Sequence, residues 1–134
     1  MKEPAVLILY SLPAPFFPDG TPDIFGQESV LSRLSAVQQA LISSGYPVQS
    51  LEAQGDLAAL LKKIRVSKTD LVFNLCEEFL GRTRLEMNIA ALLELLDIPF
   101  TGSSALALGL SQDKGKTKSL LAHQGLPTPA YCVW

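Results

Sequence analysis

The sequence has 134 residues, of which 48% are hydrophobic and 18% are charged. This length fits one domain, and the composition supplies enough apolar surface for a core and excludes a disordered chain. The formal net charge is -2, from 11 basic and 13 acidic residues, so no charge excess points to nucleic acid as a partner.

The first part of the chain predicts a buried strand, a loop and a helix. Residues 5–10 (AVLILY) are a continuous apolar run, which is typical of a strand buried on both faces of a parallel sheet. Residues 11–26 are rich in proline and contain three phenylalanines, so we expect a loop that folds over another part of the molecule. Apolar residues then recur at three- and four-residue steps over 28–44, which predicts an amphipathic helix ended by Gly45.

The alternation of strands and helices continues to the C-terminus. A short strand is predicted over 48–51, followed by a helix over 56–65 whose N-cap is Asp56. Further strands are predicted over 69–75 and 98–101, and further helices over 86–96, 105–110 and 114–123. Strands that alternate with helices predict an α/β fold, here a three-layer, Rossmann-like sandwich with a parallel sheet of about four strands.

The sequence shows no targeting or membrane segment. The apolar run near the start is too short for a signal peptide, and the longest apolar region, 89–100, carries two acidic residues and is too short to span a bilayer. Cys76 and Cys132 lie far apart in the sequence and form no CxxC motif. We therefore expect a cytoplasmic protein, without a membrane partner, whose two thiols are free and buried.

Polar loops follow three of the predicted strands. In an open parallel sheet, ligands bind at the carboxyl ends of the strands. Glu28 belongs to the first loop region, Glu77, Glu78 and Glu86 to the second, and Ser103 and Ser104 to the third. Carboxylates, hydroxyls and a helix N-terminus suit a small ligand that carries both amino and carboxylate groups.

Each of these features also has a purely structural interpretation. Glu28 and Glu86 could simply be favourable acidic residues in the first turn of a helix. Ser103 and Ser104 could form an ordinary turn and helix cap. The lysines that begin at Lys114 could be a solvated helix face. No GxGxxG, HExxH or GxxxxGK[ST] motif is present, so the residues alone define no complete active site.

Three blocks of sequence resemble the D-alanine–D-alanine ligase family of the ATP-grasp superfamily. They are DLVFNL at 70–75, AALLELLDIPFTGSS at 90–104 and LGLSQDKGKTKSLLAHQGLPTP at 108–129. The resemblance is good from about residue 70 onward and weaker before it. It is a resemblance to the N-terminal domain of the family alone.

The resemblance implies an ATP- and Mg²⁺-dependent ligase of peptidoglycan synthesis that joins a carboxylate to an amine. Residues 1–125 would form its N-terminal (pre-ATP-grasp) domain, and residues 126–134 the start of an ATP-grasp domain. Glu28, Glu86, Ser103 and Ser104 would contact an amino acid or dipeptide substrate, and Lys114 would contact the nucleotide phosphates. We expect no catalysis and no tight binding of ATP or metal by these 134 residues alone.

Two departures from the family pattern leave the substrate open. The first loop is proline-rich where the family's is glycine-rich, and only Glu28 falls near its acidic positions. The second loop carries Cys76-Glu77-Glu78 in place of the family's His-Gly. The alternatives are an ATP-grasp ligase of another substrate and a non-catalytic interaction module. An edge strand beginning at Tyr131 would favour a homodimer.

Overall fold

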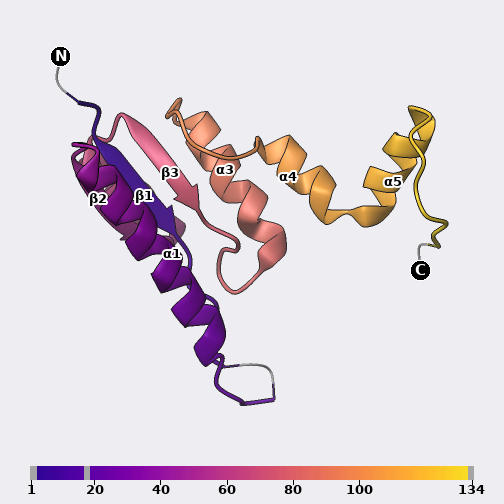
Figure 1. The fold of residues 1–134 in the computed structure, drawn as a ribbon, viewed down its shortest axis with the longest axis horizontal. Coiled ribbons are helices and arrows are strands. Elements are labelled where there is room, and N and C mark those ends of the chain that lie inside the picture. The colour runs from indigo at the N-terminus through magenta and orange to yellow at the C-terminus, as the bar shows by residue number, and fades with distance from the viewer. Residues whose placement is uncertain (1–2, 17–18, 133–134) are drawn as a thin grey trace.

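A computed structural model describes residues 3–16 and 19–132. Three parallel strands form a sheet in the order β2-β1-β3, with helices on both of its faces (Figure 1). The strands are β1 (Val6–Tyr10), β2 (Val48–Glu52) and β3 (Leu71–Leu75). The helices are α1 (Ile24–Ser43), α2 (Leu57–Ser67), α3 (Glu86–Leu95), α4 (Ala105–Gln112), α5 (Lys114–His123) and the short 3-10 turn η1 (Thr83–Leu85). The predicted α/β class with a parallel sheet is confirmed.

The predicted fourth strand is reduced to one bridge at the edge of the sheet. Val72 of β3 is paired in parallel with Phe100. The N–H of Val72 donates to the carbonyl of Pro99 (N···O 2.9 Å), and the N–H of Thr101 donates to the carbonyl of Val72 (3.0 Å). Pro99 has no N–H for a longer ladder, and Gly102 turns the chain with a φ of 112°. The sheet therefore has three strands and one bridging residue.

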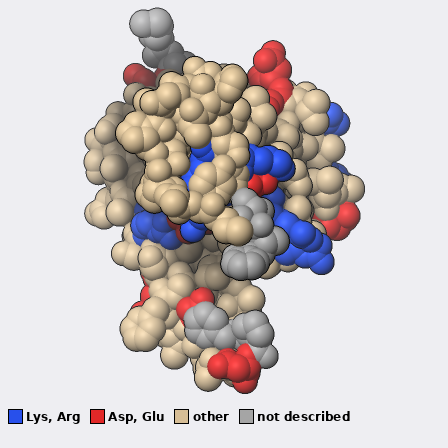
Figure 2. All heavy atoms as spheres, turned by 90° about the vertical axis from the view of Figure 1, so that its right-hand side faces the viewer, with Lys and Arg blue, Asp and Glu red and all other residues tan. Residues whose placement is uncertain are grey.

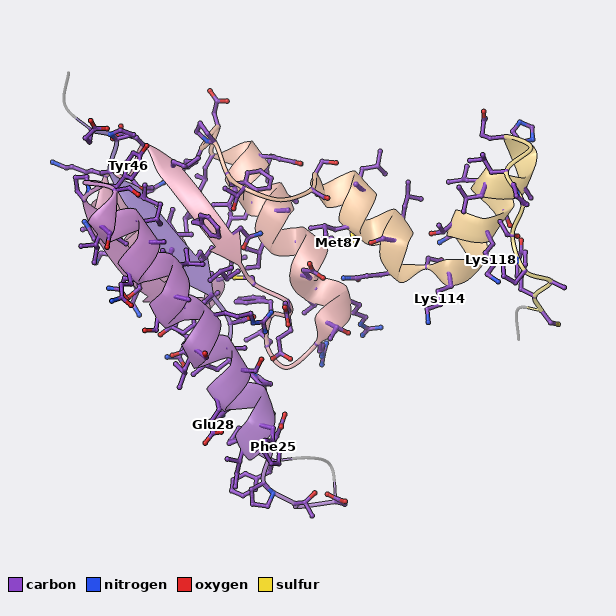
Figure 3. All side chains as sticks on the ribbon, viewed as in Figure 1. Phe25, Glu28, Tyr46, Met87, Lys114 and Lys118 are labelled. Carbon is purple, nitrogen blue, oxygen red and sulfur yellow. The ribbon has the colours of Figure 1, made fainter. Side chains whose placement is uncertain are left out.

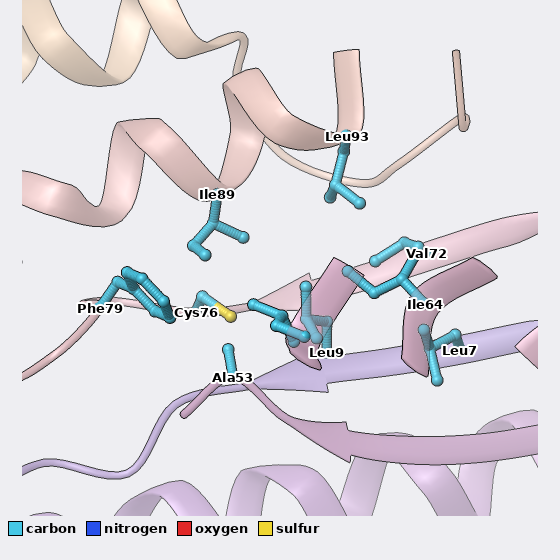
Figure 4. Packing of buried hydrophobic residues seen from close by; sticks show 10 residues of the cluster. Leu7, Leu9, Ala53, Ile64, Val72, Cys76, Phe79, Ile89 and Leu93 are labelled. Atoms are coloured by element: carbon cyan, nitrogen blue, oxygen red, sulfur yellow. The ribbon is translucent and has the colours of Figure 1, made fainter. Parts of the chain in front are cut away.

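Most of the core lies between the sheet and the helices α2 and α3. Strand β1 is the middle strand, and its alternate side chains point to opposite faces of the sheet. Leu7 and Leu9 belong to one buried cluster with Leu60 of α2 and Leu93 of α3 (Figure 4). The other face of the sheet is covered by α1 (Figure 1), which contributes buried Val30 and Leu34. The molecule is therefore layered as predicted.

Helix α1 begins earlier than the sequence predicts. The sequence pattern predicts that Gly26 lies in the preceding loop and that the helix starts at residue 28, but the helix begins at Ile24. Asp23 is the N-cap, and its Oδ1 accepts a hydrogen bond from the N–H of Gly26 (2.9 Å). A Cβ at position 26 would overlap the Asp23 carboxylate in its capping position, so glycine leaves room for the cap and does not break the helix.

The phenylalanines of the proline-rich loop do not cover another part of the chain. Phe16 is 58% exposed and Phe25 is 85% exposed, while Phe17 lies outside the described residues. The expectation that this loop folds over the domain is therefore wrong for the two phenylalanines that the structure describes.

Helices α4 and α5 extend away from the sheet (Figure 1). Helix α4 packs on α3 through a close contact at Gly109, where an added Cβ would lie 2.9 Å from Met87 Sδ. A single residue, Asp113, separates α4 from α5, and α5 has no fully buried residue. The predicted strand at Tyr131 is not formed at Tyr131 or Cys132, the last described residues. Within the described ranges, no helix is long and apolar enough to cross a membrane.

The two thiols differ in exposure. The expectation of two buried thiols holds for Cys76 and is wrong for Cys132, which is exposed; both are free. Burial, with a smaller contribution from the Glu86 carboxylate, raises the pKa of Cys76 to about 12. We expect one thiol to react with a disulfide reagent such as dithionitrobenzoate at pH 8 in the native protein, and both in urea. Reaction of two thiols at equal rates in the native protein would contradict the buried position of Cys76.

Candidate functional site

The loops that follow the three strands meet at the carboxyl edge of the sheet and enclose two adjoining cavities. The larger has a volume of about 490 Å³ and the smaller about 320 Å³. Both are lined by Ser11, Pro13 and Glu78. The larger cavity lies toward the segment that follows β2, and the smaller lies between α1 and the loop that follows β3. This is the edge at which the sequence analysis places a ligand.

Ser11 joins two of these loops. It is only 4% exposed, and its Oγ accepts hydrogen bonds from the backbone N–H groups of Glu77 (3.1 Å) and Glu78 (3.3 Å). The loop after β3 is therefore fixed to the first residue after β1. The sequence analysis did not select Ser11, because a single serine after an apolar strand has no distinctive pattern.

An ion pair lies beside the smaller cavity. The Arg33 guanidinium on α1 donates to both carboxylate oxygens of Glu77, with Nη2 to Oε2 at 3.3 Å and a shorter contact from Nη1 to Oε1. The hydrogen bond that Arg33 donates to the Glu77 carboxylate raises the pKa of Arg33. Both side chains are about half exposed, so the pair adds little to stability. Among the described residues that line this cavity, Arg33 is the only lysine or arginine, and its charge is already paired with Glu77.

Glu28 lies close to this region without lining either cavity. It is an exposed residue in the second turn of α1, and its neighbours Gln27 and Ser29 contribute to the cavity walls. Figure 3 shows Glu28 near the beginning of α1, next to Phe25. Its role as a substrate contact stays a prediction.

Glu86 is held by α4. It is the first residue of α3 and is half-buried. The side-chain amide of Gln112 donates from Nε2 to Glu86 Oε2 (2.9 Å) and to the carbonyl of Thr83 (3.0 Å). Glu86 therefore links the start of α3 to the end of α4, and it lines neither of the two cavities.

Ser103 and Ser104 lie at the opposite end of α3 from Glu86. Ser104 is the N-cap of α4, and its Oγ accepts from the N–H of Ala107 (3.3 Å). Glu94, near the end of α3, accepts from the N–H of Ala105 at the start of α4 (3.0 Å). Since the other end of α4 contacts Glu86, the two helices run antiparallel, and the structure does not bring the two serines and Glu86 together.

Lys114 is the first residue of α5 and is exposed. Its neighbours have intramolecular partners: Lys116 pairs with Asp113 (Nζ to Oδ2 2.9 Å), and Lys118 donates to the Pro129 carbonyl (3.2 Å) and lies 5.2 Å from the ring centroid of Tyr131. Lys114 has neither a hydrogen bond nor an ion pair with any described residue. The N-terminus of α5 is already capped, because the N–H of Lys116 donates to Asp113 Oδ1 (2.9 Å), so Lys114 offers a phosphate group its own charge rather than a free helix end.

The candidate phosphate and substrate positions are far apart in this chain. Figure 3 shows Lys114 on α5, well separated from Glu28 on α1. On the face that carries α5, basic atoms form separate patches with acidic atoms nearby, so there is no continuous basic stripe (Figure 2). In the described part of the chain, no group of three or more His, Cys, Asp or Glu side chains could hold a metal ion. A metal cluster made by the described residues alone is therefore absent, and Lys114 as a phosphate contact stays a prediction.

Comparisons with known proteins identify clear relatives. The D-alanine–D-alanine ligase of Syntrophotalea carbinolica is 39% identical over 98 residues, which are 73% of this chain and 30% of that protein. The D-alanine–D-alanine ligase of Moorella thermoacetica is 34% identical over 108 residues, which are 81% of this chain and 33% of that protein. This chain therefore spans about a third of the length of the curated relatives it matches. No protein-family model matches it.

A solved structure has the same fold. The crystal structure of a D-alanine–D-alanine ligase from Bacillus anthracis, complexed with ATP, matches with a TM-score of 0.65 and 21% sequence identity. The match covers 94% of this chain and 37% of that one. At this identity the match is evidence for the fold alone.

Proposed function

Since this chain belongs to the D-alanine–D-alanine ligase family, as a counterpart of its N-terminal part, we propose that it is the substrate-side domain of an ATP-dependent carboxylate–amine ligase. The observation that carries the proposal is the sequence identity of 34–39% over most of the chain, in the region that also forms the α/β fold of the Bacillus anthracis ligase.

In this proposal the carboxyl edge of the sheet forms one wall of the amino-acid site. The two cavities at Ser11 supply carboxylates for an ammonium group and a hydroxyl for a carboxylate. Glu28 lies on their rim. Glu86, Ser103 and Ser104 remain proposed substrate contacts, but in this chain Glu86 is bonded by Gln112 and Ser104 caps α4, so a substrate contact of these two would come from their remaining polar atoms.

ATP would supply the phosphoryl group that activates the substrate carboxylate. Lys114, exposed at the N-terminus of α5, would contact its phosphates. The described residues contain no group of three or more possible metal ligands, and phosphoryl transfer depends on positioning and charge stabilisation. We therefore propose that these 134 residues do not turn over alone, and that the chain acts in the cytoplasm on an amino acid or dipeptide. Homodimer formation stays a prediction.

A chimera tests this proposal directly. In the chimera, this chain replaces the part of the Syntrophotalea carbinolica ligase with which it aligns. Phosphate release is then measured with ATP and a panel of D-amino acids that includes D-alanine. We expect the chimera to release phosphate at least tenfold faster than the Syntrophotalea carbinolica ligase from which the aligned part has been removed, because the domain completes the amino-acid site. The isolated chain is expected to release none above background.

Lys114→Ala in the chimera separates the nucleotide role from the fold. Loss of a charge-assisted contact of about 1.5–3 kcal/mol corresponds to roughly a 10- to 100-fold rise in the KM for ATP. Lys62→Ala on α2 is the matched control, since Lys62 is an exposed helical lysine distant in sequence from α5. A folded chimera that releases no more phosphate than the truncated relative would contradict the proposed function.

A further inference from the structure

The larger cavity has an unusual set of polar groups for its size. Its walls come from four segments: the residues after β1, the residues after β2, the loop after β3, and Gln27 of α1. Glu52 and Glu78 contribute carboxylates, and Gln27 and Gln54 contribute amides. None of the described lining residues is a lysine or an arginine. The cavity is therefore negatively charged, and its 490 Å³ lies in the range of pockets that hold small organic ligands.

Ser11 supplies a second and independent indication of a ligand. Its Oγ accepts two backbone N–H groups, from Glu77 and Glu78, so both of its lone pairs are occupied. The remaining direction at the oxygen holds the hydroxyl proton, and no described residue accepts it in a hydrogen bond. Ser11 is almost fully buried yet lines both cavities. The hydroxyl proton is therefore available to an oxygen atom of a ligand bound in the cavity.

The Glu78 carboxylate is available to bind a positively charged group of a ligand. It is half-buried, it lines both cavities, and its side chain has no hydrogen bond or ion pair with a described residue. Glu52 lies in the same cavity, where it accepts a hydrogen bond from Gln54 Nε2 (3.1 Å) and helps to raise the pKa of Tyr10, after burial. In the smaller cavity, by contrast, the Glu77 carboxylate is already paired with Arg33.

We infer that the larger cavity binds the amine-bearing side chain of a diamino acid. This inference rests on the proposed function and names its substrate class. The α-carboxylate would accept the Ser11 hydroxyl proton, and the side-chain ammonium would lie between Glu52 and Glu78. A methyl side chain would leave this cavity unfilled, and an acidic side chain would be repelled by two carboxylates.

The test is equilibrium binding to the whole chain. Isothermal titration is carried out at low salt with lysine, norleucine and alanine, using both enantiomers of each. Norleucine has the aliphatic length of lysine without its ammonium group, so the pair isolates the charge. We expect one enantiomer of lysine to bind at least tenfold more tightly than the norleucine and alanine of the same hand.

Two variants locate the effect. Glu78→Gln keeps the shape of the side chain and removes its charge, and we expect it to reduce the preference for lysine over norleucine to less than threefold. Glu3→Gln, an exposed residue before β1 and so at the other edge of the sheet, is the matched control and should leave the preference unchanged.

Three outcomes would overturn the inference: norleucine binding as tightly as lysine, an unchanged preference in Glu78→Gln, or no binding of any of the three amino acids. These outcomes are separable from failure of the proposed function, because titration needs neither ATP nor the chimera. A chimera active with D-alanine and a chain that does not prefer lysine would leave the ligase role intact and remove only the diamino-acid specificity.

Discussion

Leu9→Ala is expected to lower the free energy of unfolding by about 2–5 kcal/mol. Leu9 is fully buried in β1, the middle strand, and belongs to the cluster that joins the sheet to α2 and α3. Truncation removes buried methyl groups and leaves a cavity that the strands on either side cannot close. Because a small domain is stable by only about 5–15 kcal/mol in total, this is a large fraction of its stability.

Urea denaturation followed by circular dichroism measures this effect as a lower midpoint at an unchanged slope. Leu95→Ala on α3 is the matched control, because Leu95 is 85% exposed and its loss should cost less than about 0.5 kcal/mol. Equal losses in the two variants would mean that Leu9 does not lie in the core described here.

Ser11→Ala is expected to cost about 1–3 kcal/mol of stability, although only one oxygen atom is lost. The N–H groups of Glu77 and Glu78 both donate to this oxygen, and alanine would leave both without their acceptor. The loop after β3 would lose its attachment to β1, so the amide hydrogens of these two residues should also exchange faster with solvent.

Hydrogen exchange measured by NMR, together with urea denaturation, tests this expectation. Ser35→Ala provides the control, since Ser35 is an exposed residue on α1. This substitution should change the free energy of unfolding by no more than a few tenths of a kcal/mol and should not speed up exchange at Glu77 and Glu78. Unchanged exchange at Glu77 and Glu78 in Ser11→Ala would argue against the serine as the anchor of the loop.

The fold was predictable from sequence because its elements carry strong local patterns. The apolar run before Ser11 is typical of a buried strand and forms β1, and Asp56 and Ser104 act as the caps that their positions indicate. The errors arose where one residue decides the outcome. Gly26 reads as a helix breaker, yet it accommodates the Asp23 cap, and Pro99 shortens the fourth strand to a bridge.

The site was less predictable, because it depends on contacts between segments that are distant in sequence. Residue type and loop position selected Glu28, Glu86, Ser103 and Ser104, but the two serines and Glu86 lie at opposite ends of α3. Ser11 was missed because its importance comes from two N–H groups 66 and 67 residues away. No local pattern encodes such a pairing.

The central position of β1 has a consequence for synthesis of the protein. Of the three strands, β1 is synthesised before β2 and β3, but Val6 pairs with Val48 on one side and with Leu71 on the other. At about 5–20 residues per second, the 65 residues from Leu7 to Leu71 take roughly 3–13 s to be added. During that time an apolar, β-prone segment has an open edge for other nascent chains. The segment that later forms the middle of the sheet is thus open to aggregation while the rest of the sheet is being made.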